Sequence, residues 1–188
     1  MKTVWTFTNK RELDKNQFID YVERKVFRTI RKHQMLPQYF AIRGTPSGAP
    51  KDKIITLKKS ENLNTKVLKQ ILETKFQVQF SNKPNISSDN LSEIAEQIFK
   101  QILKGNFNFQ NGRSPQLPAK RTTNYQLPTT RAPLLYLSDK EIELYASLKN
   151  IKGTRRKQNK TIQTLFNKFF KKNQDLELNI LKAQGQLK

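Results

Sequence analysis

Apolar residues recur at intervals of three and four in five stretches of the chain, which is the spacing of a helix with one buried face. These stretches cover residues 16–34, 63–72, 91–103, 139–149 and 160–172. Three shorter segments favour strands, and a last segment fits either a short helix or a strand: 3–7, 54–57, 76–80 and 176–187. The expected fold class is α/β or α+β: helix-rich, with about five helices on a small sheet of short strands and an extended basic loop.

Polar residues mark where several of these helices begin. The pairs Asp14–Gln17 and Ser138–Glu141 each have the spacing of a capping box, and any of residues 87–89 can cap the third helix. Pro37 is expected to stop the first helix, since proline cannot continue one. The residues that we expect to face inward from the fifth helix are Ile162, Leu165, Phe166, Phe169 and Phe170.

Charge changes this picture most. The 188 residues contain 36 Lys and Arg against 15 Asp and Glu, a formal net charge of +21. Such an excess repels itself in a compact chain, and a polyanion relieves the repulsion through neutralisation and counterion release. The sequence pI of about 10.2 is typical of a nucleic-acid-binding domain. We therefore expect a nucleic acid as the partner.

Composition also excludes several kinds of chemistry. The chain has no Cys and a single His, His33, so disulfides, thiolate metal sites, iron–sulfur clusters and Cys nucleophiles are excluded. We expect no metal site and no cofactor. No apolar run is long enough to cross a membrane and no signal peptide precedes the first strand, so the expected location is the cytoplasm.

No set of residues predicts a reaction. Residues 44–53 (GTPSGAPKDK) form the one loop similar to a phosphate cradle, but Pro46 and Pro50 remove two of the N–H donors that such a cradle needs. Glu93 and Glu96 are interpreted as the solvent-facing side of the third helix. The sequence thus favours a binding protein over an enzyme.

The cations gather in three places: the first helix, the loop over residues 106–133, and the segment beyond that loop. The loop determines the domain organisation that we expect. Residues 106–133 contain four prolines and no acid. We expect an α/β domain over 1–105, a flexible basic Pro-rich loop over 106–133, and a helical RNA-facing segment over 134–188. Aromatic residues in the loop suit stacking on unpaired bases. The predicted RNA-binding residues are Arg24, Arg28, Arg31 and Lys32 on the first helix, Arg113, Lys120, Arg121 and Arg131 in the loop, and Lys152, Arg155, Arg156, Lys157 and Lys160 beyond it.

Four segments, in order, are similar to one family. FIDYVERKVFRTIRKHQML (18–36) resembles the helix before the nucleotide-binding loop in archaeal-type tRNA thiolation enzymes of the PP-loop ATP pyrophosphatase superfamily. SSDNLSEIAEQIFKQILKGNF (87–107) is similar to that family's GHNLDDEAQTILMNFLRGD-type segment. PLLYLSDKEIELYASLKNIKG (133–153) resembles its P-L-x-x-x-x-E-K-E-I-x-L-Y-A element, and LELNILKAQGQL (176–187) resembles its C-terminal end.

The chain departs from that family at its catalytic elements. The family's SGGKDS-type loop should follow the first helix, where this chain has LPQYFAIRGTPSGAPKDKI, and the family's Cys residues are absent. The family's Asp aligns near Ser92 or Glu93. The resemblance therefore implies a shortened, non-catalytic relative, or one part of a split enzyme, that retains tRNA binding on a reduced α/β layer.

Three functions are open at this point. The first is a tRNA-binding protein derived from, or assisting, tRNA modification, with a catalytic subunit as a possible partner. The second is a structural ribonucleoprotein component that binds rRNA beside ribosomal proteins. The third is an active tRNA sulfur-transfer (adenylating) enzyme. They differ in whether tRNA, rRNA or ATP is bound.

Overall fold

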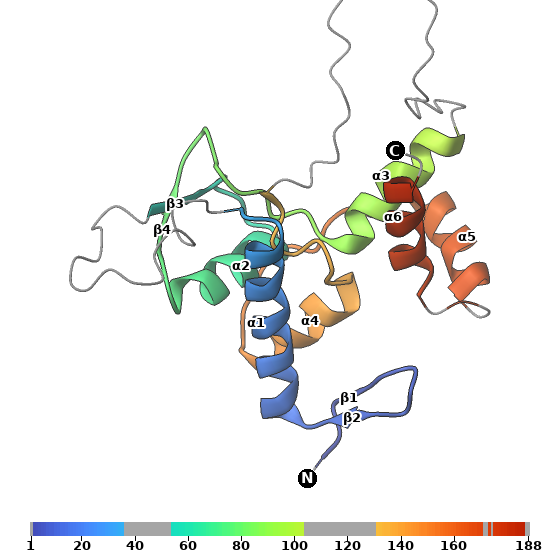
Figure 1. Cartoon of the computed structure of the whole chain (residues 1–188), viewed down its shortest axis with the longest axis horizontal. Coiled ribbons are helices and arrows are strands. Elements are labelled where there is room, and N and C mark those ends of the chain that lie inside the picture. The colour runs from blue at the N-terminus through green and yellow to red at the C-terminus, as the bar shows by residue number, and fades with distance from the viewer. Residues whose placement is uncertain (1, 36–53, 104–130, 171–172, 174, 187–188) are drawn as a thin grey trace, which may run out of the picture.

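A computed structural model describes residues 2–35, 54–103, 131–170, 173 and 175–186, and it contains six helices and two pairs of short strands over those residues (Figure 1). In chain order the elements are β1 Trp5–Thr6, β2 Glu12–Leu13, α1 Lys15–Lys32, β3 Ile54–Leu57, α2 Leu63–Glu73, β4 Gln77–Phe80, α3 Leu91–Leu103, α4 Asp139–Leu148, α5 Lys160–Phe170 and α6 Leu176–Gln186. The predicted fold class, a helix-rich chain with short strands, is confirmed. The segment left open between helix and strand is the helix α6.

Helix α1 begins and ends through local hydrogen bonds. The predicted capping box is present, with the Gln17 amide donating to the Asp14 carboxylate at 2.9 Å. At the other end Gln34 is left-handed (φ 46°) and donates to the Arg31 carbonyl, while Met35 donates to the Ile30 carbonyl. This is a Schellman motif. The helix thus ends at Lys32 through these bonds, and the predicted stop at Pro37 lies outside the described residues.

A hairpin precedes α1 and packs against its first turns. Strands β1 and β2 pair antiparallel, and the sequence pattern had predicted only the first of them. The hairpin is held by aromatic contacts, since the Trp5 ring lies 5.4 Å from Phe18 and the Phe7 ring lies 5.1 Å from Tyr21. Ring centroids at these separations stabilise beyond the area that they bury.

Strand β3, helix α2 and strand β4 form a βαβ unit. The strands pair in parallel, with Ile55 opposite Val78 and Leu57 opposite Phe80. Helix α2 crosses between them and buries Leu68 and its apolar neighbours beside β3. Both strands therefore end at the same edge, which is where ligands bind in parallel α/β sheets.

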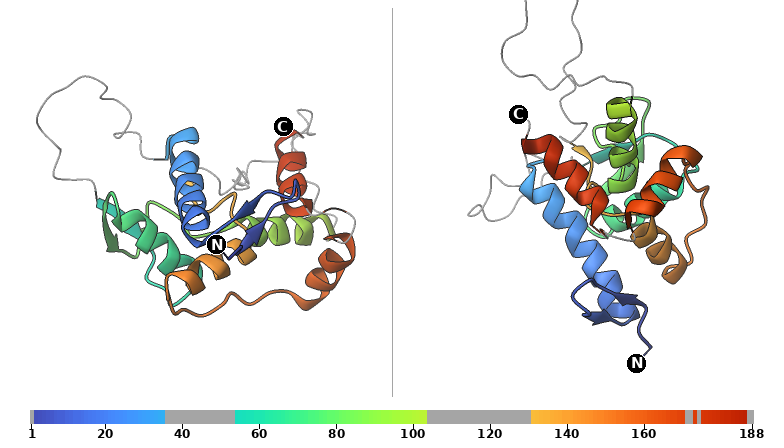
Figure 2. Two further views of the ribbon diagram at one scale, coloured as in Figure 1. Left: turned by 90° about the horizontal axis from the view of Figure 1, so that it is seen from below. Right: turned by 90° about the vertical axis from the view of Figure 1, so that its right-hand side faces the viewer.

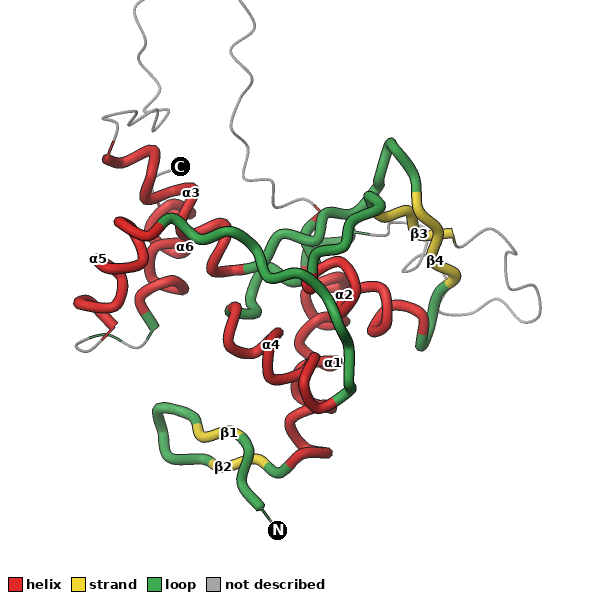
Figure 3. Tube along the Cα trace, turned by 180° about the vertical axis from the view of Figure 1, so that it is seen from behind, coloured by secondary structure: helices red, strands yellow, loops and turns green. Residues whose placement is uncertain are grey.

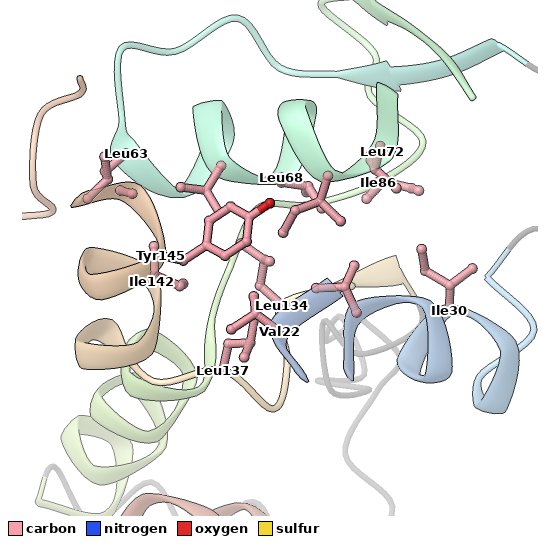
Figure 4. Close-up of a cluster of buried hydrophobic side chains, with 14 of the residues drawn as sticks. Val22, Ile30, Leu63, Leu68, Leu72, Ile86, Leu134, Leu137, Ile142 and Tyr145 are labelled. Atoms are coloured by element: carbon pink, nitrogen blue, oxygen red, sulfur yellow. The ribbon is translucent and has the colours of Figure 1, made fainter. Parts of the chain in front are cut away.

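The main core lies between α1, α2 and α4 and takes in the segment before α4 (Figure 4). Val22 of α1, Leu68 of α2 and Tyr145 of α4 are at most 1% exposed, and Leu134 fills the space between them. The last residues of the predicted loop, 132–133, are buried as well. The chain on both sides of residues 104–130 thus contributes to one core, and the predicted domain boundaries stay a prediction.

Helices α3, α5 and α6 pack together beside this core (Figure 2). Ile162 and Phe166 of α5 face α3, as their spacing predicts. Phe169 does not: its side chain is 50% exposed, so its predicted inward position is wrong. The loop between α4 and α5 passes from the first group of helices to the second (Figure 3). No described helix combines the length and the apolar character that a bilayer-spanning segment requires.

Candidate nucleic-acid interface

The exposed side of α1 carries most of the cations predicted for it. Arg24, Arg28, Arg31 and Lys32 are all exposed. Arg24 forms an ion pair with Asp20 one turn away, at 2.7 Å, and both side chains remain more than half exposed. The other three have no described carboxylate at ion-pair distance. Since the helix C-terminus favours positive charge, this end of α1 tolerates the cluster without an acid.

An aromatic pair lies beside this end of α1. His33 Nε2 is 3.1 Å from the Tyr136 hydroxyl, and the two rings stack with centroids 5.9 Å apart. The Lys32 ammonium lies 5.5 Å from the centre of the Tyr136 ring. Partial burial first, and the neighbouring Lys32 second, lower the pKa of His33 below its ordinary value. The imidazole is therefore held neutral more readily than a free one, and the local positive charge comes from the α1 side chains.

Another α1 lysine turns inward. Lys25 donates to the Glu141 carboxylate at 2.7 Å and to the Tyr21 hydroxyl at 2.7 Å, and Tyr21 also donates to Glu141 at 2.8 Å. Burial and the adjacent carboxylate raise the pKa of Tyr21, so it stays a neutral donor. Lys25 therefore joins α1 to α4 and is not part of the exposed basic side of α1.

The predicted RNA-binding residues between α4 and α5 are of two kinds, exposed side chains and one side chain held within the protein. Lys152, Lys157 and Lys160 are exposed, and Arg155 is 74% exposed although it pairs with Glu143 at 3.1 Å. Arg156 is only 12% exposed and forms ion pairs with both Glu96 and Asp139. Its guanidinium is fully engaged within the protein, so we leave Arg156 out of the interface.

Glu96, the partner of Arg156, is buried in α3, and Glu93 is half-buried, so the predicted solvent-facing role of these two residues is wrong. Burial opposes the ionisation of Glu96, but hydrogen bonds from Lys100 and Arg156 outweigh it and lower the pKa of Glu96. Nearby Asn90 caps α3 by accepting from the Glu93 amide at 2.9 Å. The cap is thus one residue beyond the predicted range 87–89.

Two further carboxyls near Arg156 have pKa values that are shifted in the opposite direction, upward. Burial raises the pKa of Glu93, and the negative charge of Asp89 adds to the effect. Burial also raises the pKa of Glu177 in α6, against a hydrogen bond from Ser92. Several acids thus gather around one arginine in a chain that is otherwise strongly basic. Among the residues that the structure describes, no group of three or more metal-binding side chains is placed to hold a metal ion.

A pocket of about 450 Å³ opens where β3 and β4 end. Its walls are formed by residues 57–60 after β3, residues 84–89 after β4, Asn62 and Thr65 at the start of α2, and Arg131. The lining contributes Lys58, Lys59 and Arg131 as cations and Asp89 as an acid, among hydroxyl and amide groups. This composition suits an anionic or strongly polar ligand.

Hydrogen bonds fix the shape of this pocket. Thr65 Oγ1 lies 3.0 Å from Ser88 Oγ, and the Ser87 amide donates to the Arg131 carbonyl at 2.8 Å. Arg131, predicted to lie in a flexible loop, is therefore anchored by its backbone while its side chain is exposed. The sequence pattern contained a signal for this pocket: a strand, a Lys-Lys-Ser turn and a helix, followed by a second strand.

Gly153 has a packing role at the start of α2. A Cβ atom at Gly153 would lie 2.9 Å from Leu63 Cα and 3.0 Å from Leu63 N. The neighbouring Thr154 accepts from the Leu63 amide at 2.9 Å and donates to the Glu61 carbonyl at 2.8 Å. The loop therefore lies against the α2 backbone at a distance that only glycine permits.

The remaining predicted site residues, Arg113, Lys120 and Arg121, lie outside the described residues, as does the 44–53 loop.

Comparisons of the sequence with protein-family models and with curated proteins find no match. The fold, in contrast, is similar to that of the U34-tRNA thiolase NcsA from Methanococcus maripaludis, solved with its [4Fe-4S] cluster. The TM-score is 0.63 at 10% sequence identity, and the alignment covers 98% of this chain and 84% of that chain. The resemblance of the four sequence segments to one family is thus supported at the level of fold. The shortened form and the missing nucleotide loop stay predictions.

Proposed function

We propose that this protein binds RNA, with tRNA as its expected ligand, as a non-catalytic relative of tRNA thiolation enzymes. Two independent features support the proposal: a net charge of +21 and a fold similar to that of an enzyme named for its action on tRNA. Counterion release from the phosphate backbone would supply most of the affinity.

The observation that carries the proposal is how the charges are distributed. Eight carboxylates form ion pairs with described cations: Asp20, Glu23, Glu61, Glu73, Glu96, Asp139, Glu141 and Glu143. The pairs of Glu96, Asp139 and Glu141 join different elements away from solvent. At the end of α1, Arg28, Arg31 and Lys32 have no such partner among the described residues, and the same holds for Lys152 and Lys157 of the α4–α5 loop and for Lys160 at the start of α5. We therefore assign the interface to Arg28, Arg31 and Lys32, with Arg131, Lys152, Lys157 and Lys160 as further contacts.

Sulfur transfer by an iron–sulfur cluster does not fit this chain. Such clusters are held by Cys thiolates, and the sequence contains no Cys. The role that we propose is therefore to hold the RNA, and any sulfur chemistry would belong to a catalytic subunit.

The test compares tRNA with an rRNA fragment of matched length by fluorescence anisotropy. A variant with Arg28, Arg31 and Lys32 replaced by Gln should lose tRNA affinity. The matched control replaces Lys2, Arg11 and Lys15 by Gln. These residues are exposed near the other end of α1, and their replacement removes the same amount of positive charge. Equal loss in both variants would contradict the assigned surface, and an unmodified protein that binds no RNA would contradict the function.

A second candidate function is that of an adenylating enzyme. The pocket at the β3–β4 edge is the observation that supports it. Its lysines and Arg131 suit a phosphate-bearing ligand. A thermal shift with Mg–ATP separates the two candidates, because a non-catalytic RNA-binding protein should show none. The rRNA-binding alternative predicts co-sedimentation with ribosomal subunits and preference for the rRNA fragment.

A further inference from the structure

We propose that a second surface, the aromatic edge, stacks unpaired RNA bases. It is formed by Phe27 of α1, Phe76 just before β4, Phe80 at the end of β4, and the neighbouring Lys69 and Lys75. The inference rests on the proposed RNA-binding function and names the form of RNA that it recognises. Phe27 directly precedes Arg28 on α1, and the other members of the aromatic edge come from α2, β4 and the turn between them.

The strand pattern explains why aromatic side chains reach this edge. Side chains alternate between the two faces of a strand, so Phe76, Val78 and Phe80 share one face of β4. That face points toward α2, because Val78 and Phe80 are paired with the buried residues Ile55 and Leu57 of β3. Even so, Phe80 is 45% exposed. Within the described residues no other strand pairs with β4, and this leaves the rim of the ring open.

Each end of β4 combines a ring with a lysine. The Lys69 ammonium lies 5.3 Å from the centre of the Phe80 ring. At the other end, the Lys75 ammonium lies 4.1 Å from the centre of the Phe27 ring, which itself packs 6.2 Å from Phe76. Since each ammonium lies over one face of its ring, a base would stack on the exposed part of the Phe80 ring while the cation contacts the adjacent phosphate.

The surrounding charge selects a polyanion over a protein chain of mixed charge. Residues 54–83 contain six lysines and two glutamates. Both glutamates are already paired, Glu61 with Lys66 and Glu73 with Lys69. The lysines without a described carboxylate at ion-pair distance are Lys58, Lys59, Lys75 and Lys83. An exposed aromatic residue in a segment whose lysines outnumber its glutamates three to one is the composition of a single-strand-binding surface.

The test measures binding of a short oligoadenylate and of an RNA duplex of the same length. Phe80→Leu keeps apolar bulk but removes the ring, and Phe169→Leu is the matched control, since Phe169 is 50% exposed on α5. We expect Phe80→Leu to weaken oligoadenylate binding by about fivefold or more and to leave duplex binding unchanged. Phe169→Leu should change neither, and Phe80→Trp should retain binding.

Phe80→Trp also tests the surface if the leucine variant fails to fold. Its added indole should be quenched by oligoadenylate and not by the duplex, relative to the protein with Trp5 alone. Unchanged oligoadenylate affinity in Phe80→Leu would overturn the inference while leaving the proposed function standing. Loss of a concentration-dependent self-association in that variant would assign the aromatic edge to a second copy of the chain instead. An unmodified protein that binds neither RNA would contradict the proposed function itself.

Discussion

Arg156 and Asp139 are joined by a two-point ion pair. The Arg156 Nε atom lies 3.0 Å from Oδ1 and 2.8 Å from Oδ2 of Asp139, and Nη2 lies 2.8 Å from Oδ2. The same guanidinium reaches Glu96 of α3, while Asp139 opens α4 and accepts from the Asn90 side chain. One arginine in the α4–α5 loop therefore holds both helices together.

Replacing Arg156 with Met should lower the free energy of unfolding by about 3 kcal/mol, because it removes the guanidinium from the buried Glu96 and the half-buried Asp139, and Lys100 is then the one cation paired with Glu96 among the described residues. Urea unfolding followed by circular dichroism measures this loss. The adjacent Arg155→Met is the control: its ion pair is exposed, so its effect should stay within about 0.5 kcal/mol. Equal effects of the two substitutions would show that the buried ion pairs do not hold α3 and α4.

The half-buried carboxyl of Glu93 leads to a prediction about pH. Its folded-state pKa is raised, so the folded protein binds its proton more tightly than the unfolded chain does. Below the ordinary glutamate pKa of about 4.3 the raised pKa of Glu93 does not reduce the free energy of unfolding. Above that pH the free energy of unfolding falls, until the pH has passed the folded-state pKa of Glu93. Glu93→Gln should therefore gain stability over the unmodified protein as pH rises from acidic to neutral.

Thermal unfolding over that pH range measures the difference between the two proteins. Glu177→Gln should behave in the same way, since burial also raises the pKa of Glu177. Glu73→Gln is the control, because Glu73 is exposed and pairs only weakly with Lys69. A stability difference for Glu93→Gln that does not change with pH would contradict the burial of this carboxyl.

Gly153→Ala should destabilise the protein by about 1–3 kcal/mol, the usual range for forcing an extra methyl group into a packed site. The new Cβ would lie 2.9 Å from Leu63 Cα, and a backbone atom cannot move aside as a flexible side chain can. The measurement is the free energy of unfolding, with the exposed neighbour Lys152→Ala as control. A neutral Gly153→Ala would mean that the loop separates easily from α2.

The sequence pattern predicted nearly every element and far less of the pairing between them. Helix spacing and capping boxes are local, so α1 and α4 could be placed within a few residues. The two-residue strand β2 gave no signal of its own. Arg155 and Arg156 are adjacent and chemically identical, yet one is exposed and the other is buried. Their difference depends on Glu96, sixty positions away, and no local pattern contains that contact.

The sequence pattern already contained a signal for the pocket. The predicted order of strand 54–57, helix 63–72 and strand 76–80 already implies a βαβ unit, and ligands bind at the carboxyl ends of its strands. That rule points to Lys58 and Lys59. Arg131 could not have been found in this way, because its position depends on a backbone contact with Ser87 across the fold.

The salt dependence of tRNA binding should distinguish the free cations of α1 from the paired one. Arg28→Gln should reduce the slope of log affinity against log salt by about 0.7–0.9, the value for one lost phosphate contact. Arg24→Gln should reduce the slope less, because Asp20 already neutralises that guanidinium at 2.7 Å. Anisotropy titrations over a range of salt concentrations measure both slopes. Identical slopes for Arg28→Gln and the unmodified protein would remove this face of α1 from the interface, because a cation that contacts a phosphate must release a counterion when it binds.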